Sequence, residues 1–337
     1  MTGRRIAVIG AGSWGTALAD CLARNGHRVR LWSHEPEVAD SITTRHSNEA
    51  YLPGVELHGD LHATTNYSEL LAGAEILVSV SPSEFVRTAV EAARPFIEGR
   101  PLLVSASKGL ELGTDLRMSE VLLQVLGAEI AEGCVVLSGP SFAAELARRQ
   151  PTAVTLASRS ERNAIAVQGL FQNEHFRLYT QSDVIGTELG GALKNVIALA
   201  AGISDGLELG HNARAALLTR SLAEMRRLTQ RLGGEPETLA GLAGVGDLIL
   251  TCTGDLSRNR TVGLEIGRGR SLEEVLSGMR SVAEGVRTTQ AALDLAGRHG
   301  VEMPIAEAVY SILFEGVEPR RALALLMARE PKPERWS

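Results

Sequence analysis

A glycine-rich turn near the start of the chain constrains the fold more than any other feature. Residues 10–15 read GAGSWG, after the apolar run at residues 6–9 and before a helical pattern at residues 16–23. In such a G-x-G-x-x-G, the three glycines permit a tight turn, close approach to a pyrophosphate and close packing of helix on strand. Amides at the helix N-terminus then face the phosphate charge. The turn therefore predicts a dinucleotide-binding unit of the Rossmann type.

The first half of the chain alternates between strand-like and helix-like segments. Strand candidates lie at residues 5–9, 28–32, 76–79, 102–105, 135–137 and 152–157, and helical segments such as 82–93 and 160–171 separate most of them. This alternation predicts a doubly wound, mostly parallel sheet, in which ligands bind beyond the carboxyl ends of the strands. Loops of unusual composition follow three of these strands, at residues 81–83, 107–109 and 138–141.

The sequence pattern changes near Asp183. Beyond it, helical patterns rich in Ala, Leu and Glu continue almost to the C-terminus, and strand patterns stop. A chain of 337 residues is also long enough for about two domains. We therefore expect an α/β Rossmann-type domain with a doubly wound sheet at residues 1–183, followed by an all-α domain at residues 184–337 that carries the substrate and catalytic groups.

Composition narrows the class of protein. With 34 basic and 40 acidic residues the net charge is −6, and only 4% of residues are aromatic, so neither a nucleic-acid footprint nor a base-stacking surface is expected. The three cysteines, Cys21, Cys134 and Cys252, are few and far apart, as expected of buried thiols in a reducing compartment. We expect neither a signal peptide nor an apolar stretch of membrane-spanning length. A cytoplasmic protein without membrane insertion is predicted.

The helix that starts near Gly186 carries the most informative lysine. At about 100° per residue, Lys194 is the single long charged side chain on a face of small residues. That face comprises Thr187, Gly190, Gly191, Ala198 and Ala201, and the opposite, buried stripe comprises Leu189, Leu193, Val196, Leu199 and Ala200. Small residues let another domain or a ligand come close and partly desolvate the ammonium, as a general acid or base requires. The alternative is a solvated surface lysine.

Three further segments each have a functional and a structural interpretation. Lys108 lies in a loop after a strand, where it would hold a substrate oxygen or phosphate, or simply be exposed. Asp247 either caps a helix at residues 248–251 or, with Thr251 on the same face, orients an ammonium or a hydroxyl. Residues 257–260 (SRNR) start another helix, which is either a phosphate site or a capped surface helix with solvated arginines.

The histidines do not indicate a metal site. His58 and His62 are four residues apart, but Gly59 and the turn residues around it argue against the helix that would bring both rings to one face. We expect no metal.

Seven motifs in order resemble the bacterial NAD(P)-dependent glycerol-3-phosphate dehydrogenase family, and the resemblance covers nearly the whole chain. They are residues 10–15 (GAGSWG), 107–111 (SKGLE), 138–145 (SGPSFAAE), 190–195 (GGALKN), 241–248 (GLAGVGDL), 257–259 (SRN) and 282–285 (VAEG). The resemblance implies reversible oxidation of sn-glycerol 3-phosphate to dihydroxyacetone phosphate, usually run as the reduction that feeds phospholipid synthesis.

The resemblance also implies roles for individual positions. Lys194 matches the catalytic acid/base lysine. The positions that match substrate contacts are Lys108, Gly139, Ser141, Lys194, Asp247, Ser257, Arg258 and Asn259. Beside the turn glycines Gly10, Gly12 and Gly15, the positions that match cofactor contacts are Ser13, Trp14, His34, Tyr51, Lys108, Ala143, Arg258, Val282 and Glu284.

The end of the second strand bears on the choice of cofactor. An NAD-selective unit usually ends that strand with an acid that binds the ribose 2′-hydroxyl and repels a 2′-phosphate. Here Trp32 is followed by Ser33 and His34, and Glu35 comes one step later. We therefore expect NADPH to be accepted and preferred, with NAD as a possible second cofactor.

Two other functions remain open at this point. A related NADP-dependent hydroxyacid dehydrogenase would replace the substrate phosphate with a carboxylate, which an arginine also binds. A nucleotide-sensing protein without turnover would use Lys194 and Asp247 structurally. The expected partner is a small-molecule substrate, and the sequence leaves open whether a second copy of the chain forms a homodimer.

Overall fold

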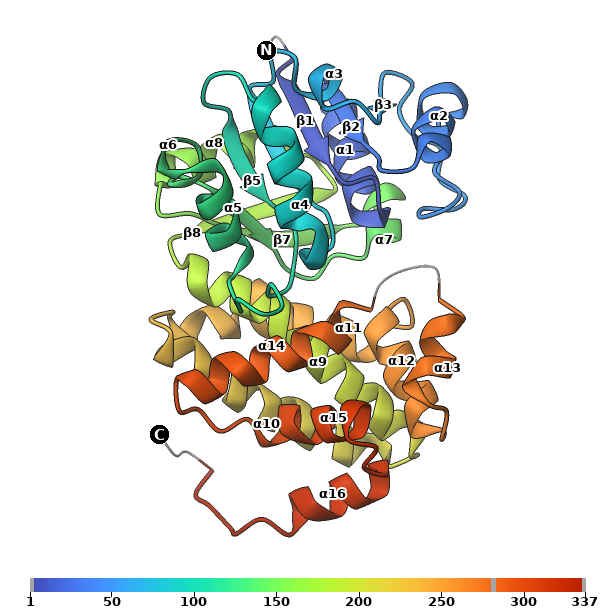
Figure 1. Ribbon diagram of the computed structural model, residues 1–337, viewed down its shortest axis with the longest axis vertical. Helices are drawn as coiled ribbons and strands as arrows, with labels where there is room; N and C mark the ends of the chain where they lie inside the picture. The colour runs from blue at the N-terminus through green and yellow to red at the C-terminus, as the bar shows by residue number, and fades with distance from the viewer. Residues whose placement is uncertain (1–2, 280–282, 335–337) are drawn as a thin grey trace. The chain divides into compact units, whose positions relative to one another are not determined.

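The computed structural model describes residues 3–279 and 283–334 of the chain. These residues form two compact units, one of residues 3–108 and 116–184 and one of residues 109–115, 185–279 and 283–334 (Figure 1). The first is an α/β unit around a single sheet, and the second is helical. The predicted fold class, a Rossmann-type doubly wound sheet followed by an all-α region, is confirmed.

The sheet of the first unit has the order β3-β2-β1-β4-β5-β6-β7-β8. Among the described residues its neighbouring strands are parallel, except that β7 runs antiparallel to β6. The strands are β1 (Arg5–Ile9), β2 (Arg28–Trp32), β3 (His62–Thr64), β4 (Ile76–Ser79), β5 (Leu102–Ser105), β6 (Val135–Ser138), β7 (Thr152–Ala157) and β8 (Phe176–Gln181).

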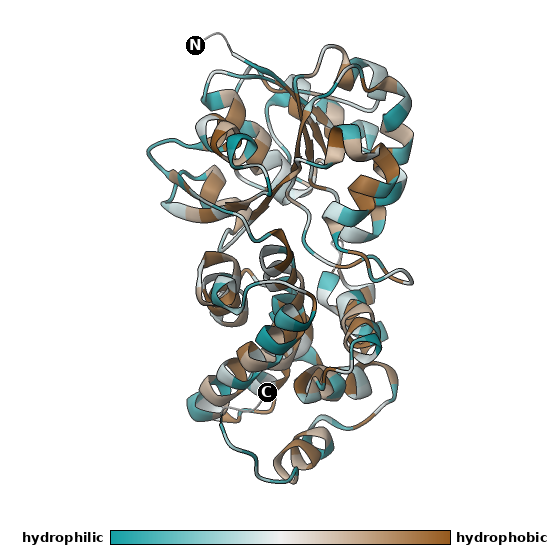
Figure 2. Cartoon of the chain, turned by 90° about the vertical axis from the view of Figure 1, so that its left-hand side faces the viewer, coloured by the Kyte–Doolittle hydropathy of each residue, from teal (hydrophilic) through white to brown (hydrophobic). Residues whose placement is uncertain are grey.

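Helices cover both faces of this sheet because successive side chains of a strand point to opposite faces. Ile6 and Val8 of β1 enter one apolar cluster with α1, whereas Ala7 and Ile9 enter a second cluster with α4 and α5. Figure 2 shows the strands as an apolar layer between the helices. The helices are α1 (Ser13–Arg24), α2 (Pro36–Arg45), α3 (Tyr67–Leu71), α4 (Ser83–Ala93), α5 (Met118–Leu126), α6 (Ala128–Ala131), α7 (Ala143–Ala147) and α8 (Glu161–Phe171).

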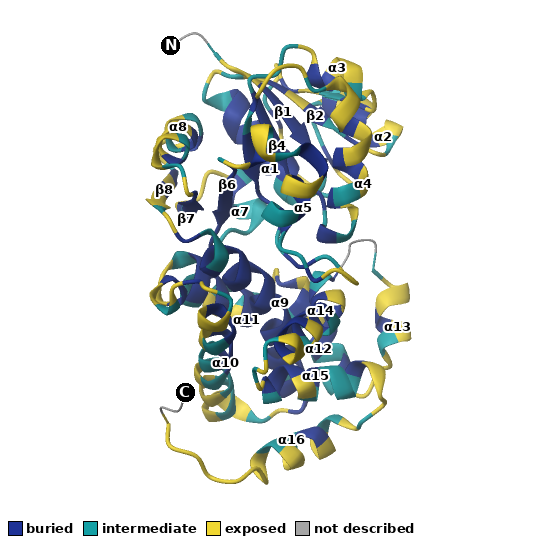
Figure 3. Ribbon diagram, turned by 60° about the vertical axis from the view of Figure 1, so that its left-hand side comes forward, coloured by how far each residue is buried: buried dark blue, intermediate teal, exposed yellow. Residues whose placement is uncertain are grey.

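The second unit packs helices around α9 (Val184–Gly206). Every residue of α9 from Gly186 to Ser204 is buried, which Figure 3 shows as a dark blue helix. The other helices are α10 (Gly210–Arg231), α11 (Asp247–Thr253), α12 (Arg258–Gly267), α13 (Leu272–Ser277), α14 (Glu284–Arg298), α15 (Pro304–Phe314) and α16 (Pro319–Met327).

The structure corrects one expectation about α9 and adds to another. The helix is long and apolar enough to cross a membrane, although we expected no such stretch; 89% of its apolar window is buried inside the protein, as in a core helix. Part of the small-residue face, at Gly190, and the adjacent Gly202 pack against backbone of the helical unit itself. A Cβ on Gly190 would lie 2.3 Å from the Ala243 carbonyl oxygen, and one on Gly202 would lie 2.1 Å from that of Arg260. The small residues let neighbouring backbone pack against the helix.

Residues 109–115 belong to the helical unit, although the sequence analysis included them in the first domain. The segment lies between β5 and α5 in the sequence. Leu110 is buried in the helical core cluster, and the buried Asp115 forms an ion pair with Arg298 of α14. The chain therefore leaves the sheet unit at residue 108, contributes to the helical core and returns at residue 116.

Candidate active site

The glycine turn lies between β1 and α1, and each glycine has its own steric reason. Gly10 has a φ of +123°, and a Cβ there would lie 2.9 Å from the Ser81 nitrogen. A Cβ on Gly15 would lie 1.8 Å from the Gly10 oxygen, so the helix can pack on the strand only without a side chain. A Cβ on Gly12 would meet nothing within 4 Å. Open space therefore lies beside Gly12 at the start of α1.

The start of α1 has the features of a phosphate site. Ser13 and Trp14 are its first residues, Gly12 is the residue before them, and no side chain caps the amides of the first turn in the described structure. The Trp14 Nε1 is buried and has no hydrogen-bond partner among the described residues. Asn48, which the sequence analysis missed, supports the turn by donating to the Ala11 oxygen at 2.9 Å and to Thr16 Oγ1 at 2.8 Å. The amides and the open space fit a dinucleotide pyrophosphate.

The two remaining cofactor candidates near the turn are His34, just after β2, and Tyr51, which contacts Glu35 beside it. His34 is exposed two residues after the strand ends at Trp32, and the two rings are 6.1 Å apart. Tyr51 donates its hydroxyl hydrogen to Glu35 Oε1 at 3.0 Å. Burial, followed by this bond to Glu35, raises the pKa of Tyr51. Glu35, the nearest acid after β2, thus has its carboxylate engaged by a neighbouring side chain.

The loops after β5 and β6 bring together three predicted substrate residues. Lys108 Nζ donates to the Gly139 carbonyl oxygen at 2.9 Å, and Ser141 Oγ donates to the same oxygen at 2.9 Å. Gly139 has a φ of +141°, and a Cβ there would lie 3.0 Å from the Val154 Cα. Ala143, a predicted cofactor residue, begins α7 two residues after Ser141. Lys108 is therefore held in place rather than free in solvent.

In the helical unit, Lys194 forms a buried cluster with two residues of α11. Its Nζ donates to Asp247 Oδ1 and, at 2.9 Å, to Thr251 Oγ1. Thr251 in turn donates to the Asp247 carbonyl oxygen at 2.6 Å. Lys194 is 7% exposed and Asp247 is fully buried. Because an unpaired charge in such a place is costly, the ion pair and the hydroxyl make burial of both charges possible.

The structural interpretation of Asp247 as a helix cap is wrong, because its side chain does not cap α11. Asp247 is the first residue of α11, and the π-helical turn Leu242–Gly246 leads into it. Within this turn, a Cβ on Gly244 would lie 2.1 Å from the Leu239 oxygen. The glycines of the turn thus let the backbone fold tightly enough to bring the Asp247 carboxylate to Lys194.

A second polar network connects α9, α12 and α14. Asn259 donates from Nδ2 to Asn195 Oδ1 at 2.9 Å and accepts at Oδ1 from the Gly285 amide at 2.9 Å. Asn195 donates to Glu284 Oε2 at 3.4 Å. The sequence analysis gave Asn195 no role, and its only signal is that it follows Lys194 directly. Asn259 and Glu284, predicted as ligand residues, are therefore tied to each other through Asn195.

The start of α12 carries the predicted phosphate anchor. Ser257 caps this helix by accepting from the Arg260 amide at 3.3 Å. Arg258 is exposed at the first helical position. Arg260 is instead held inward by Asp205 at 2.9 Å and Asp255 at 3.1 Å. Of the two arginines, Arg258 is thus exposed, whereas Arg260 is engaged in ion pairs with Asp205 and Asp255. Val282, a predicted cofactor residue, lies outside the described residues.

Comparisons with known proteins agree with this architecture. The family described as NAD-dependent glycerol-3-phosphate dehydrogenase N-terminus matches residues 5–164, and its C-terminus counterpart matches residues 183–324. A glycerol-3-phosphate dehydrogenase (NAD(P)+) of Geobacter metallireducens is 54% identical over 99% of both chains. One of Myxococcus xanthus is 51% identical over 98% of both chains.

Solved structures give the same result. The crystal structure of the glycerol-3-phosphate dehydrogenase from Coxiella burnetii has a TM-score of 0.93 and 41% identity, covering 98% of this chain and 100% of that one. A ketopantoate reductase from Ralstonia eutropha has a TM-score of 0.58 at 15% identity over 94% of this chain and 99% of that one, so it shares the fold alone. From both matched halves and these relatives, the chain belongs to the NAD-dependent glycerol-3-phosphate dehydrogenase family.

Proposed function

We propose that this protein catalyses the NAD(P)H-dependent, reversible reduction of dihydroxyacetone phosphate to sn-glycerol 3-phosphate, which supplies the backbone of glycerophospholipids. The observation that carries this proposal is the buried Lys194, paired with Asp247 and Thr251. Full-length relatives at 54% identity have the same activity in their names. The family membership favours this function over the hydroxyacid dehydrogenase and the nucleotide sensor.

Lys194 acts as the proton donor in the reductive direction. When bound at the glycine turn, the nicotinamide cofactor supplies the hydride for the ketone carbon. Lys194, as the ammonium, donates a proton to the alkoxide that develops on the carbonyl oxygen. Asp247 favours the charged form of the lysine, and Thr251 fixes the Nζ position because its own proton goes to the Asp247 carbonyl oxygen. Acid catalysis of this kind typically contributes about 10²–10⁴-fold.

The phosphate of the substrate serves as a remote handle. Arg258 provides a guanidinium at the start of α12, where the helix also favours negative charge. Asn259 follows it on a side chain fixed by Asn195 and Gly285. Lys108, held by the Gly139 oxygen, polarises a substrate oxygen. Binding energy at the phosphate then positions the carbonyl for reaction.

NADPH is the preferred cofactor, and NADH is also accepted. The first exposed side chain after β2 is His34, which tolerates a 2′-phosphate better than a carboxylate at that position does. The nearest acid, Glu35, accepts a hydrogen bond from Tyr51. The α/β unit is the dinucleotide-binding domain, and the helical unit, which includes residues 109–115, is the catalytic domain of a cytoplasmic enzyme. The enzyme is a homodimer, which sedimentation equilibrium tests by giving twice the mass of the chain.

One assay tests the reaction. NADPH absorbance is followed with dihydroxyacetone phosphate, with unphosphorylated dihydroxyacetone and with 2-keto acids as separate substrates. Rapid oxidation with dihydroxyacetone phosphate alone is expected. Oxidation with a 2-keto acid and none with dihydroxyacetone phosphate would assign the chain to the hydroxyacid dehydrogenases, and no oxidation with any of them would favour the nucleotide sensor.

A further inference from the structure

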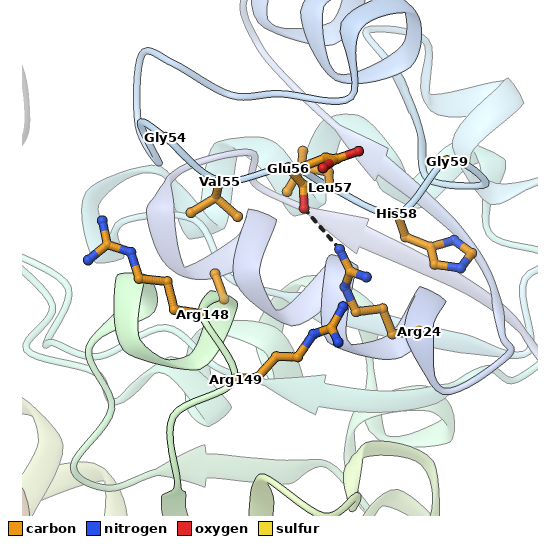
Figure 4. Close-up of a pocket in the computed structure, with 10 residues that line it drawn as sticks. Arg24, Gly54, Val55, Glu56, Leu57, His58, Gly59, Arg148 and Arg149 are labelled. Atoms are coloured by element: carbon orange, nitrogen blue, oxygen red, sulfur yellow. Dashed lines mark hydrogen bonds between the residues drawn. The ribbon is translucent and has the colours of Figure 1, made fainter.

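A cavity of about 450 Å³ in the sheet unit is lined by three arginines that the proposed reaction does not use. Arg24 comes from the end of α1, Arg148 and Arg149 follow α7, and residues 54–59 form the opposite wall. Figure 4 shows the guanidinium groups of Arg24 and Arg149 near each other below this loop, and that of Arg148 apart from them, below Gly54. The glycine turn lies at the other end of α1, a helix of 12 residues and therefore about 18 Å long. The cavity is thus separate from the turn.

A buried carboxylate behind the cavity wall holds two of the residues that line the cavity, Arg24 and His58. Asp20 is 1% exposed; its Oδ2 accepts from Arg24 Nε at 2.7 Å, and its Oδ1 accepts from the His58 amide at 2.7 Å. Arg24 also donates from Nη2 to the Glu56 carbonyl oxygen at 2.9 Å. Asp20 therefore holds both the arginine and the loop in position before any ligand binds.

The other two arginines lack a counter-charge. Neither Arg148 nor Arg149 forms an ion pair within the part of the chain that the structure describes. Glu56 lines the cavity too, but Figure 4 shows its carboxylate turned away from the arginines. Two uncompensated guanidinium groups on a chain of net charge −6 make this cavity a local concentration of positive charge.

Arg149 is also held in an unfavourable backbone conformation. Its φ is +59°, in the left-handed region, where glycine is the usual residue after a helix. Basic side chains near the C-termini of α1 and α7 interact favourably with the carbonyl groups at those helix ends, which is reason enough for a positive charge there. This interaction does not explain why an arginine occupies the position after α7 that a glycine would occupy without strain. Strain of this kind is typical of sites where a side chain has a ligand to bind.

We propose that this cavity binds a diphosphate, either inorganic pyrophosphate or the diphosphate of a nucleotide. The planar guanidinium forks of Arg24, Arg148 and Arg149 each suit phosphoryl oxygens, and two linked phosphoryl groups offer three such forks more oxygens and more charge than one orthophosphate does. The cavity volume is within the range of small-molecule sites.

The test measures binding by calorimetry with the catalytic sites filled. The enzyme is saturated with NADPH and glycerol 3-phosphate, which cannot react because both are the reduced partners. Pyrophosphate, ADP and orthophosphate are then titrated at constant ionic strength. We expect pyrophosphate or ADP to bind at least about tenfold more tightly than orthophosphate, and the tighter of the two identifies the source. Equal or undetectable binding of all three would overturn the proposal.

Arg149→Gly separates a ligand role from a structural one, because glycine keeps the left-handed backbone while it removes the side chain with its guanidinium. We expect its dissociation constant for the diphosphate to rise by about tenfold, as loss of one charged hydrogen bond implies, while its Tm without ligand stays at or above wild type. Arg28→Ala, at an exposed arginine of β2 outside the cavity, is the matched charge control and should bind normally. Unchanged binding in Arg149→Gly, or equal losses in both variants, would contradict the assignment.

Discussion

At the scale of single residues, Lys194 shows how a reactive charge is kept inside a folded protein. It lies in the middle of a helix whose other residues from Gly186 to Ser204 are also buried. The neighbours that make this possible, Asp247 and Thr251, come from α11, more than fifty positions along the chain. The contacts with Asp247 and Thr251 that stabilise the buried ammonium also fix its position, so the same interactions serve both burial and catalysis.

Lys194→Ala should lower kcat by at least about 100-fold, because the proton donor is lost, while NADPH still binds at the glycine turn. Steady-state kinetics and fluorescence titration of NADPH measure the two effects. The variant also leaves Asp247 buried without its partner, which costs about 3–5 kcal/mol of stability. Lys194→Ala/Asp247→Ala is the control, since it removes both charges and should regain stability but not activity. Nearly intact turnover in either variant would exclude Lys194 as the acid.

His34→Asp should move the cofactor preference toward NADH. A carboxylate at this position binds the ribose hydroxyls of NADH and repels the 2′-phosphate of NADPH. We expect the ratio of kcat/KM for NADPH over NADH to fall by at least about tenfold, which corresponds to about 1.4 kcal/mol of differential binding. His62→Asp, at an exposed position of β3, is the control for an added acid in the same unit. An equal change in both variants would show that only the net charge matters.

At the scale of elements, glycines decide how closely α9 packs. Gly202→Ala would place a Cβ 2.1 Å from the Arg260 oxygen of α12, so the helices would have to separate. Such overpacking lowers the free energy of unfolding by about 1–3 kcal/mol. Urea unfolding should therefore show a lower midpoint for the variant. Gly169→Ala in α8 is the matched control, because its Cβ meets nothing within 4 Å. It should stabilise by about 0.5–1 kcal/mol through helix propensity, and a loss of equal size in both variants would refute the packing argument.

The contact between α10 and α15 contains a carboxyl that titrates near neutrality. Glu224 is 3% exposed, and its Oε1 accepts from the Ile305 amide at 2.9 Å in the first turn of α15. Burial raises the pKa of Glu224 to about 7, against the opposing effects of the Ile305 and Ala306 amides and Arg227; Glu307 raises it further. The folded protein therefore favours the protonated carboxyl.

Stability should fall as the pH rises through 7 because of Glu224. A carboxyl whose pKa is higher in the folded state contributes stability that is complete below its unfolded value of 4.5 and is lost as the pH passes the folded value. The wild type should lose about 3 kcal/mol between pH 4.5 and pH 8 relative to Glu224→Gln, whose amide does not titrate in this range. Urea unfolding of both proteins across this range measures the difference. Parallel pH profiles would assign the dependence to other groups.

At the scale of the whole molecule, the chain passes through the helical unit before completing the sheet unit. Residues 109–115 contribute Leu110 to the helical core and the buried Asp115 to an ion pair with Arg298. The stability of the helical unit therefore depends on a segment whose neighbours in the sequence belong to the sheet.

Leu110→Ala should destabilise the helical unit by about 2–4 kcal/mol, because it leaves a cavity in that core. Hydrogen exchange followed by mass spectrometry separates the units, and protection should fall in peptides from 185–337 and remain in those from 5–108. Leu103→Ala, in β5 and the sheet core, is the reciprocal control and should show the opposite pattern. Loss of protection confined to the sheet unit in Leu110→Ala would contradict the assignment of 109–115.

Part of this organisation could be predicted from local sequence. The six expected strands were found because buried parallel strands are continuous apolar runs. β8 was missed because it is half buried, with alternating residues, and β3 because it has three residues. Helix α9 was found, but not that it is buried all round, since small residues read equally well as an open face or as close packing.

The sequence by itself determined the class of fold, the glycine turn and the residue types of the site, because these depend on short-range periodicity and on local steric needs. Only the tertiary structure decided which charges meet. The partnership of Lys194 with Asp247, the Asn195–Asn259–Gly285 network and the passage of residues 109–115 into the helical core all join distant segments. Local sequence patterns do not predict such contacts, because the contacts form only when buried charges and amides pair with one another in the folded core.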